Sequence, residues 1–220
     1  MLEAEWAFPS ADGVHGVCNL TEALLRESVT DLLENGKDVD LLLKDAGDQK
    51  RLALTDAFRS STSWARMTYT DAIKELEKAT SSNGVRFNYE LEWGRPLQSE
   101  HERFLADTVI RGPVFITDYP ASLKPFYMRV NGDGRTVACF DLLVPYVGEL
   151  VGGSVREERI EILEKKIESG YEWYLELRKA GGAPHAGFGL GFERLVSWLA
   201  GIDNIRECIP MPRWAGRLLL

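Results

Sequence analysis

The chain has 220 residues, enough to bury one core, and its apolar and charged contents of 45% and 27% are ordinary for a globular protein. Its net charge of −8 argues against a protein that coats nucleic acid by bulk electrostatics, although it allows local basic contacts to RNA. Three scattered cysteines without a C-x-x-C pair argue against a disulfide framework and a structural zinc site. No apolar run is long enough to span a membrane, so no membrane partner is expected.

The first residues alternate as in a strand, with Glu3 and Glu5 on one side and Ala4 and Trp6 on the other. A chain that opens inside a patterned strand is typical of a fragment or of a misplaced start. Helical patterns follow, and a Ser81–Gly84 turn lies among them. The expected helices are a leucine-striped one capped by Asn19 and ending at Asn35 (Leu20, Leu24, Leu25, Leu32, Leu33), short ones at 41–43 and 52–58, and capped ones at 70–78 and 99–107.

One dipeptide of the last of these helices needs a separate test. His101-Glu102 resembles half of a zinc-protease helix, but Leu105 stands where the second histidine would be, which excludes that function.

The pattern then changes to closely spaced strands. Strands are expected at 114–117, 126–130, 136–143 and 148–151, with Asn131–Gly134 as a hairpin turn between two of them. Helices resume at 156–169 and 171–180. Because strands and helices are grouped and do not alternate, the sequence predicts an α+β fold with a mainly antiparallel sheet flanked by helices.

The segment from Pro184 to Arg194 has a glycine at every second position, Gly187, Gly189 and Gly191, before a helix that contains Arg194. Bare glycines on one strand face let a flat ligand lie against the backbone. An arginine at the following corner can present its fork to a phosphate. A glycine-rich turn packed against a helix would show the same pattern, and the spacing is not that of a dinucleotide fold.

Asp141 and Glu149 fall on two neighbouring predicted strands, and a Gly-Gly-Ser turn leads from there to Arg156. Two carboxylates beside bare backbone can hold Mg²⁺, although solvated strand-face acids would look the same. Arg156 is expected to begin a helix, where a surface salt bridge is the simpler interpretation. Together these residues describe a nucleotide site on an antiparallel sheet.

Two segments resemble class II aminoacyl-tRNA synthetases of the aspartate/asparagine/lysine subgroup: Glu149-x-x-Gly-Gly-Ser-x-Arg156 and Pro184-His-x-Gly-Phe-Gly-Leu-Gly-Phe-Glu-Arg194. Within that family the chain looks like the asparagine-specific members. The resemblance is collinear over essentially the whole chain. Its supporting segments are Thr117–Pro120, Phe126–Arg129, Asp141–Pro145 and Asn204–Arg213.

The resemblance implies a role for each site residue. Arg194 would hold the ATP γ-phosphate, and Asp141 and Glu149 would carry ATP through Mg²⁺. The glycines Gly187, Gly189 and Gly191 would receive the nucleotide. Arg156 would donate to the side-chain carbonyl of a bound asparagine. The other amino-acid contacts would be Glu3, which accepts from the carboxamide, Glu5 on the same face, and His185 at the border.

The resemblance also implies the reaction, which is ATP-dependent activation of asparagine and transfer to tRNA(Asn). A donor and an acceptor around one carboxamide favour asparagine over aspartate, and Gly152 stands where aspartate-specific relatives more often have serine. Three alternatives remain open: an aspartate-specific synthetase, an inactive nucleotide-binding or regulatory module, and an enzyme that makes asparagine from aspartate.

On this resemblance, residues 1–220 are part of a catalytic domain that lacks its N-terminal motifs and the anticodon-binding domain. We therefore expect weak or no activity from the chain alone, and a homodimer in the full-length protein. The compartment, cytoplasm or mitochondrion, stays open.

Overall fold

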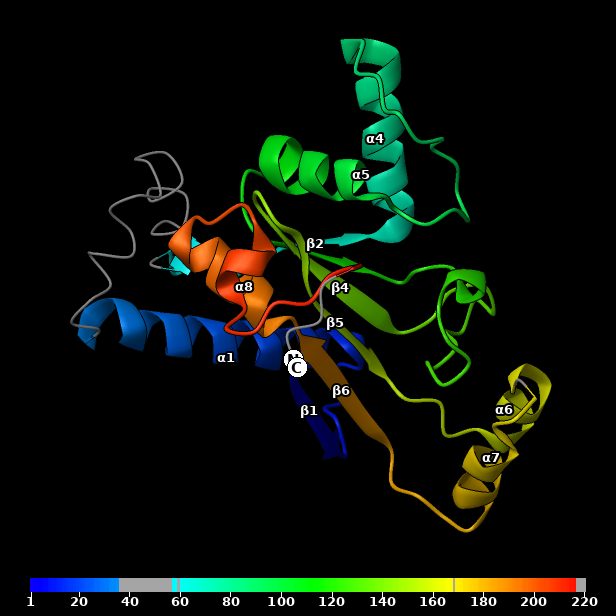
Figure 1. The fold of residues 1–220 in the computed structure, drawn as a ribbon. Helices are drawn as coiled ribbons and strands as arrows, with labels where there is room; N and C mark the ends of the chain where they lie inside the picture. The colour runs from blue at the N-terminus through cyan, green and yellow to red at the C-terminus, as the bar shows by residue number, and fades with distance from the viewer. Residues whose placement is uncertain (36–56, 59, 168, 217–220) are drawn as a thin grey trace.

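The computed structural model describes residues 1–35, 57–58, 60–167 and 169–216 (Figure 1). A six-stranded sheet in the order β1-β6-β5-β4-β3-β2 forms its centre. Strands β2 and β3 are parallel, and all other neighbours are antiparallel. The predicted α+β fold with a mainly antiparallel sheet is confirmed. The strands are β1 (Leu2–Ala7), β2 (Ala65–Thr68), β3 (Val114–Thr117), β4 (Cys139–Val144), β5 (Gly148–Val155) and β6 (His185–Leu190).

The helices fall into two groups around this sheet, and α6 and α7 form a hairpin that extends away from it (Figure 1). A π-helical segment, Phe104–Ile110, continues α5, and Ile205–Cys208 forms a short 3₁₀ turn, η3. The helices are α1 (Val14–Asn35), α4 (Tyr69–Asn83), α5 (Ser99–Arg103), α6 (Ile160–Lys166), α7 (Glu172–Lys179) and α8 (Phe192–Ala200). None of the described helices is both long and apolar enough to cross a membrane.

The two faces of the sheet are covered differently. On one face, α1 and α8 pack on even-numbered strand residues such as Phe140 and Phe188, with Trp198 in the same cluster. On the other face, α4 and the π-helical segment cover only the β2, β3 and β4 side, where Ile116 and Cys139 are buried. Among the described helices, α5 reaches this second face at the start of β5, at Gly148 and Glu149, and the rest of the face over β5, β6 and β1 is left uncovered. That uncovered area is where the candidate site lies.

The first helix begins earlier than the sequence suggested and buries a different face. It starts at Val14, so Asn19 is an interior residue and not its cap. Its buried face is Val17, Cys18, Leu25 and Val29. The expected leucine stripe is wrong in three members, because Leu20, Leu24 and Leu32 are exposed. A helix so rich in leucine offers two apolar faces, and periodicity alone does not say which one is buried.

Other elements confirm or correct the expectations. The helix predicted at 70–78 begins one residue earlier, is capped by Thr68 and runs through 83, so most of the predicted 81–84 turn is helical. The Asn131–Gly134 turn is confirmed by a Gly134 N–H to Asn131 O hydrogen bond of 3.0 Å. The predicted strand 126–130 makes only isolated bridges, at Met128 and Val130. Strand β2 was not predicted, and the helices expected at 41–43 and 52–58 lie outside the described residues, apart from 57 and 58.

The cap of α4 gives a test of the local structure. Gly84 ends the helix with φ at +67°, and its N–H donates to Ala79 O. An L-residue strains this left-handed conformation. Gly84→Ala should therefore lower the free energy of unfolding by about 1 kcal/mol in urea denaturation. Gly112→Ala is the matched control, because its Cβ also meets nothing within 4 Å and its φ is not left-handed. Equal losses in both variants would contradict the assigned cap.

Candidate active site

A row of residues in register crosses the uncovered face. Glu3 on β1 pairs with Gly189 on β6, which pairs with Gly152 on β5, which pairs with Asp141 on β4. Side chains in register on neighbouring strands point to the same face of a sheet. The two glycines carry none, so the two acids stand at the ends of a stretch of bare backbone. This backbone forms the floor of the site.

The next row contains a third glycine, Gly187, that cannot be replaced. Glu5 pairs with Gly187, which pairs with Ser154. A Cβ on Gly187 would lie 1.9 Å from Glu5 Oε2 and 2.6 Å from the Ala4 carbonyl oxygen. The Glu5 carboxylate therefore lies directly over the Gly187 backbone, in space that any side chain would take.

Gly191 does not share this role. The sequence suggested three glycines on one strand face, but β6 ends at Leu190 and Gly191 is the N-cap of α8. A Cβ there would lie 3.3 Å from the Arg194 side chain. Gly191 is therefore near Arg194 and not part of the strand floor.

A β-bulge places Glu149 on the site face. The β4–β5 register runs Leu142↔Val151 and then Leu143↔Glu149, so Leu150 is an extra residue in β5. Without the bulge, strand alternation would point Glu149, which is three residues before Gly152, to the opposite face. With it, Glu149 Oε1 comes within 3.2 Å of the position of a Cβ on Gly152, and Asp141 Oδ1 within 3.5 Å. The two acids thus approach each other above Gly152.

Arg156 directly follows β5 and is held by an ion pair with Glu5. Its Nε and Nη2 each donate to one Glu5 oxygen at 2.9 Å, and Nη1 donates to Ser154 Oγ. Its guanidinium lies 5.3 Å from the centre of the Tyr127 ring. The expected helix start at Arg156 is wrong, and Gly152–Ser154 are strand residues, not a turn. A two-bond fork of this kind fixes the plane of the guanidinium.

His185 lies beside this pair in its neutral form. Nδ1 is 3.0 Å from Ala183 O, and Nε2 is 2.8 Å from Arg178 Nη2. Because an arginine can only donate, Nε2 accepts and Nδ1 carries the proton. Burial lowers the pKa of His185, and the charge of Arg178 lowers it further. His185 Nε2 is also 3.7 Å from Glu5 Oε1, which ties α7 to the Arg156 pair.

Asp141 has a cationic partner that the sequence did not indicate. Lys124 Nζ donates to both Asp141 oxygens, at 2.9 and 2.7 Å, and lies 4.1 Å from the centre of the Tyr119 ring. Burial alone would lower the pKa of Lys124, but the Asp141 carboxylate raises it above its ordinary value. Lys124 therefore stays charged and sits at the rim of the site.

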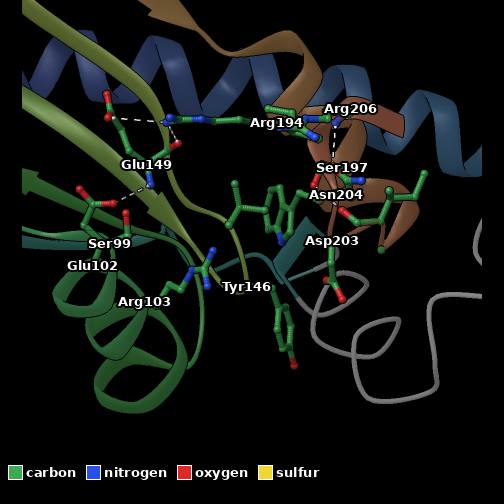
Figure 2. A pocket seen from close by; sticks show the side chains of 15 residues that line it. Ser99, Glu102, Arg103, Tyr146, Glu149, Arg194, Ser197, Asp203, Asn204 and Arg206 are labelled. Atoms are coloured by element: carbon green, nitrogen blue, oxygen red, sulfur yellow. Dashed lines mark hydrogen bonds and ion pairs between the residues drawn. The ribbon is translucent and has the colours of Figure 1, made fainter. Parts of the chain in front are cut away.

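Glu149 is held between a cation and a second acid, as Figure 2 shows. Arg194 Nη1 donates to the Glu149 carbonyl and lies 3.7 Å from its Oε2. On the other side, Glu102 Oε2 accepts from the Glu149 N–H at 3.3 Å. Burial raises the pKa of Glu149, and the Asp141 charge raises it further. Burial and the Glu149 charge likewise raise the pKa of Glu102.

A cavity of about 600 Å³ opens over these residues. Its walls come from β1, β4, β5, β6 and the 124–128 loop, and it brings together Glu3, Glu5, Lys124, Tyr127, Asp141, Glu149, Gly152, Arg156 and Gly189. Of the residues predicted from sequence, His185, Gly187, Gly191 and Arg194 lie outside its lining. His185 and Gly187 contact the lining residue Glu5, and Arg194 contacts the lining residue Glu149. Gly191 lies beside Arg194.

Two carboxylates above a bare glycine fit a hard divalent cation. Mg²⁺ is commonly bound by one or two carboxylates together with the phosphates of a substrate. Asp141 and Glu149 supply such a pair above Gly152. No group of three or more metal-binding side chains occurs in the described part of the chain, so a protein-only cage is not formed there.

Glu102, Lys124 and Arg178 are the site residues that sequence reasoning missed. Glu102 received attention only as half of an excluded zinc motif. Lys124 lies in a loop without periodicity, and Arg178 lies on the predicted helix 171–180, to which no site role was given. The sequence signal for Lys124 is its place just before the predicted strand 126–130, whose Tyr127 and Met128 line the cavity.

The geometry defines an α+β domain with charged side chains around a bare sheet floor, and comparison with known proteins identifies its class. The family model for class II tRNA synthetases (D, K and N) matches residues 1–215. The chain belongs to this family.

Several similar proteins are named for one amino acid of this family, asparagine. The asparagine–tRNA ligase of Bacillus anthracis is 46% identical over 222 residues, which are 98% of this chain and 46% of the relative. The Pyrococcus horikoshii asparaginyl-tRNA synthetase complexed with asparaginyl-adenylate superposes with a TM-score of 0.78 at 34% identity, over 98% of this chain and 47% of that one.

The Entamoeba histolytica enzyme, also in complex with asparaginyl-adenylate, gives a TM-score of 0.79 at 30% identity, over 98% and 47% of the two chains. The chain spans about half the length of the relatives it matches.

The glycine floor can be tested by stability alone. Gly187→Ala should lower the free energy of unfolding by about 2 kcal/mol, because its Cβ collides with Glu5 and with backbone. Gly189→Ala is the matched control on the same strand, since its Cβ would meet only the end of the Met1 side chain, at 3.3 Å. A Gly189→Ala loss as large as that of Gly187→Ala would contradict the floor geometry.

The buried acids predict a pH dependence. The folded-state pKa of Glu102 is raised above the ordinary 4.5, so the folded protein binds more protons than the unfolded protein in the window above that value. Stability therefore falls as pH rises through the window.

Glu102→Gln cannot ionise, yet its amide oxygen can still accept from Glu149 N–H. Its unfolding free energy relative to the parent chain should therefore increase from about pH 4 to about pH 7. Urea denaturation at several pH values measures this difference. Exposed Glu77→Gln on α4 is the control, and parallel curves for both variants would contradict the assignment.

Proposed function

We propose that this chain carries the amino-acid activation site of an asparagine–tRNA ligase. The observation that carries the proposal is the bidentate Glu5–Arg156 pair beside Glu3 in one cavity. The names of the relatives support it, and two solved structures with asparaginyl-adenylate share the fold.

The pair gives a physical basis for the choice of amino acid. Glu5 takes two donors of Arg156 and neutralises its charge. Arg156 is then a fixed donor for a neutral carbonyl oxygen, and Glu3 is an acceptor for an amide N–H. An aspartate side chain would place an anion next to Glu3 without a compensating donor, so the site rejects it.

The reaction would be adenylation. An oxygen of the asparagine carboxylate attacks the α-phosphorus of ATP, the bond from that phosphorus to the oxygen bridging the β-phosphate breaks, and pyrophosphate leaves with the electron pair. A hydroxyl of the terminal ribose of tRNA(Asn) then attacks the carbonyl carbon of the adenylate, the bond from that carbon to the phosphate oxygen breaks, and AMP leaves. Such sites act by positioning and by charge stabilisation, and no protein nucleophile is required.

Charged residues of the chain have separate parts in this scheme. Lys124 and Arg194 supply positive charge at the two sides of the acids, near where phosphate oxygens would lie. Asp141 and Glu149 would hold Mg²⁺, which when bound would neutralise phosphate charge. Gly152 and Gly189 leave the floor open to the substrate, and Gly187 leaves room for the Glu5 carboxylate. The full-length homodimer rests on the family resemblance alone.

Asparagine-dependent ATP–pyrophosphate exchange tests this function, with aspartate as the control substrate. It should be measured on this chain and on a version extended upstream with the segment that precedes the matched region in a Bacillus relative. Exchange with asparagine alone, in the extended version, would support the proposal. Nucleotide binding without exchange in either version would favour a synthetase-derived binding module.

The role of Glu3 predicts a change in selectivity. In the extended chain, Glu3→Gln should reduce the ratio of kcat/KM for asparagine over aspartate by about tenfold to a hundredfold, because the anion that repels aspartate is removed. Exchange rates with each amino acid measure it. Glu27→Gln is the control, since Glu27 is exposed on α1, which covers the opposite face of the sheet. An unchanged ratio in Glu3→Gln would remove Glu3 from the amino-acid site.

A further inference from the structure

A second cavity adjoins the site, and apart from Glu149 and Arg194 its lining residues have no part in the scheme above. It measures about 570 Å³ and lies past the β4–β5 turn, between α5 and α8 (Figure 2). We call it the annex cavity. Glu149 lines both cavities, so the annex begins at the acid that borders the reacting phosphates. Its charged lining residues are three arginines, Arg103, Arg194 and Arg206, and three acids, Glu102, Glu149 and Asp203; Ser99, Tyr146, Ser197, Trp198 and Asn204 also line it.

Three arginines line the annex from three different elements. Arg103 comes from α5, Arg194 from α8 and Arg206 from η3 (Figure 2). Arg206 also lies over the Trp214 ring, 4.9 Å from its centre, so the guanidinium has an aromatic neighbour. Ser99, Ser197 and Asn204 add neutral polar groups to the same wall.

Two of these arginines make no ion pair with a described residue, although Arg103 lies near Asp107 and Arg206 stacks on Trp214. Arg129, Arg156 and Arg159 each pair with a glutamate. Among the described residues, no carboxylate lies within ion-pair distance of Arg103 or Arg206. Glu102, the acid nearest to Arg103 in sequence, turns one oxygen to the Glu149 N–H. The annex therefore offers guanidinium groups to an anion from outside, as phosphate-binding sites do.

We propose that the annex cavity binds inorganic pyrophosphate as it leaves the main cavity. The proposal rests on the adenylation function above, because that reaction releases pyrophosphate on the Glu149 side of the floor. A multiply charged anion that departs there meets Arg194 first, at the boundary, and then Arg103 and Arg206. Planar arginine forks match phosphate oxygens better than point charges do.

Direct binding tests the site without any need for turnover. Titration calorimetry would measure pyrophosphate, and separately ATP, on this chain and on Arg103→Gln and Arg206→Gln. Each variant should weaken pyrophosphate binding about tenfold at low salt, because each removes one charged donor. ATP binding should change less than about twofold, since the annex lies beyond the proposed nucleotide position. Arg86→Gln is the matched control, because Arg86 is exposed and lines neither cavity.

Each contrary result has a separate meaning. Pyrophosphate that fails to bind, or that binds both variants as tightly as the parent chain, would overturn the annex site. An equal loss for ATP and pyrophosphate would also overturn it as a departure site, because Arg103 and Arg206 would then hold the phosphates of the nucleotide. Loss of pyrophosphate binding in both variants, with no asparagine-dependent exchange in the extended chain, would sustain the anion site while removing the proposed function.

Discussion

The absence of side chains from one patch of the sheet is the constraint on which the site depends. Gly152, Gly187 and Gly189 clear the second face of β5 and β6. The first face of the same strands is filled by Phe188 and its neighbours, which pack under α1 and α8. Because side chains alternate along a strand, the same strands can carry densely packed core residues on one face and bare backbone on the other. A ligand on this floor would rest on atoms that the core holds in place.

Charges around the floor come in matched pairs: Asp141 with Lys124, Glu5 with Arg156, and Glu149 with Arg194. Partly buried ions need such partners, because an unpaired charge there would be costly. The pairs also orient donors and acceptors before a ligand arrives. A site of fixed dipoles stabilises developing charge with little reorganisation, which is how the arrangement would act on a phosphoryl group. The same pairing means that a ligand at Asp141 competes with Lys124.

The sequence predicted most strands and the fold class, because alternation and turn glycines are local signals. It also placed Asp141 and Glu149 on neighbouring strands. It failed where tertiary contacts decide. The buried side of α1 is chosen by the sheet beneath it and not by its leucines. The extension of β5 through Gly152–Ser154 was taken for a turn, since glycine pairs usually interrupt strands. Lys124 and Glu102 belong to the site only through contacts with Asp141 and Glu149, which are distant in the sequence. The spacing of residues along the sequence does not predict such contacts.

The extra residue at Leu150 carries a consequence for how this domain can change over evolutionary time. Loop lengths in folded proteins drift readily, but the span from Gly148 to Val151 sets on which side of the sheet an acid appears. Loss of the Leu150 codon would leave a regular strand with Glu149 two residues before Gly152, still on the site face, but without one buried core side chain. Gain of one further residue between Glu149 and Gly152, paired without a second bulge, would instead turn the acid toward the core. A longer sequence in this short span would therefore remove the acid pair, whereas a shorter one would keep it.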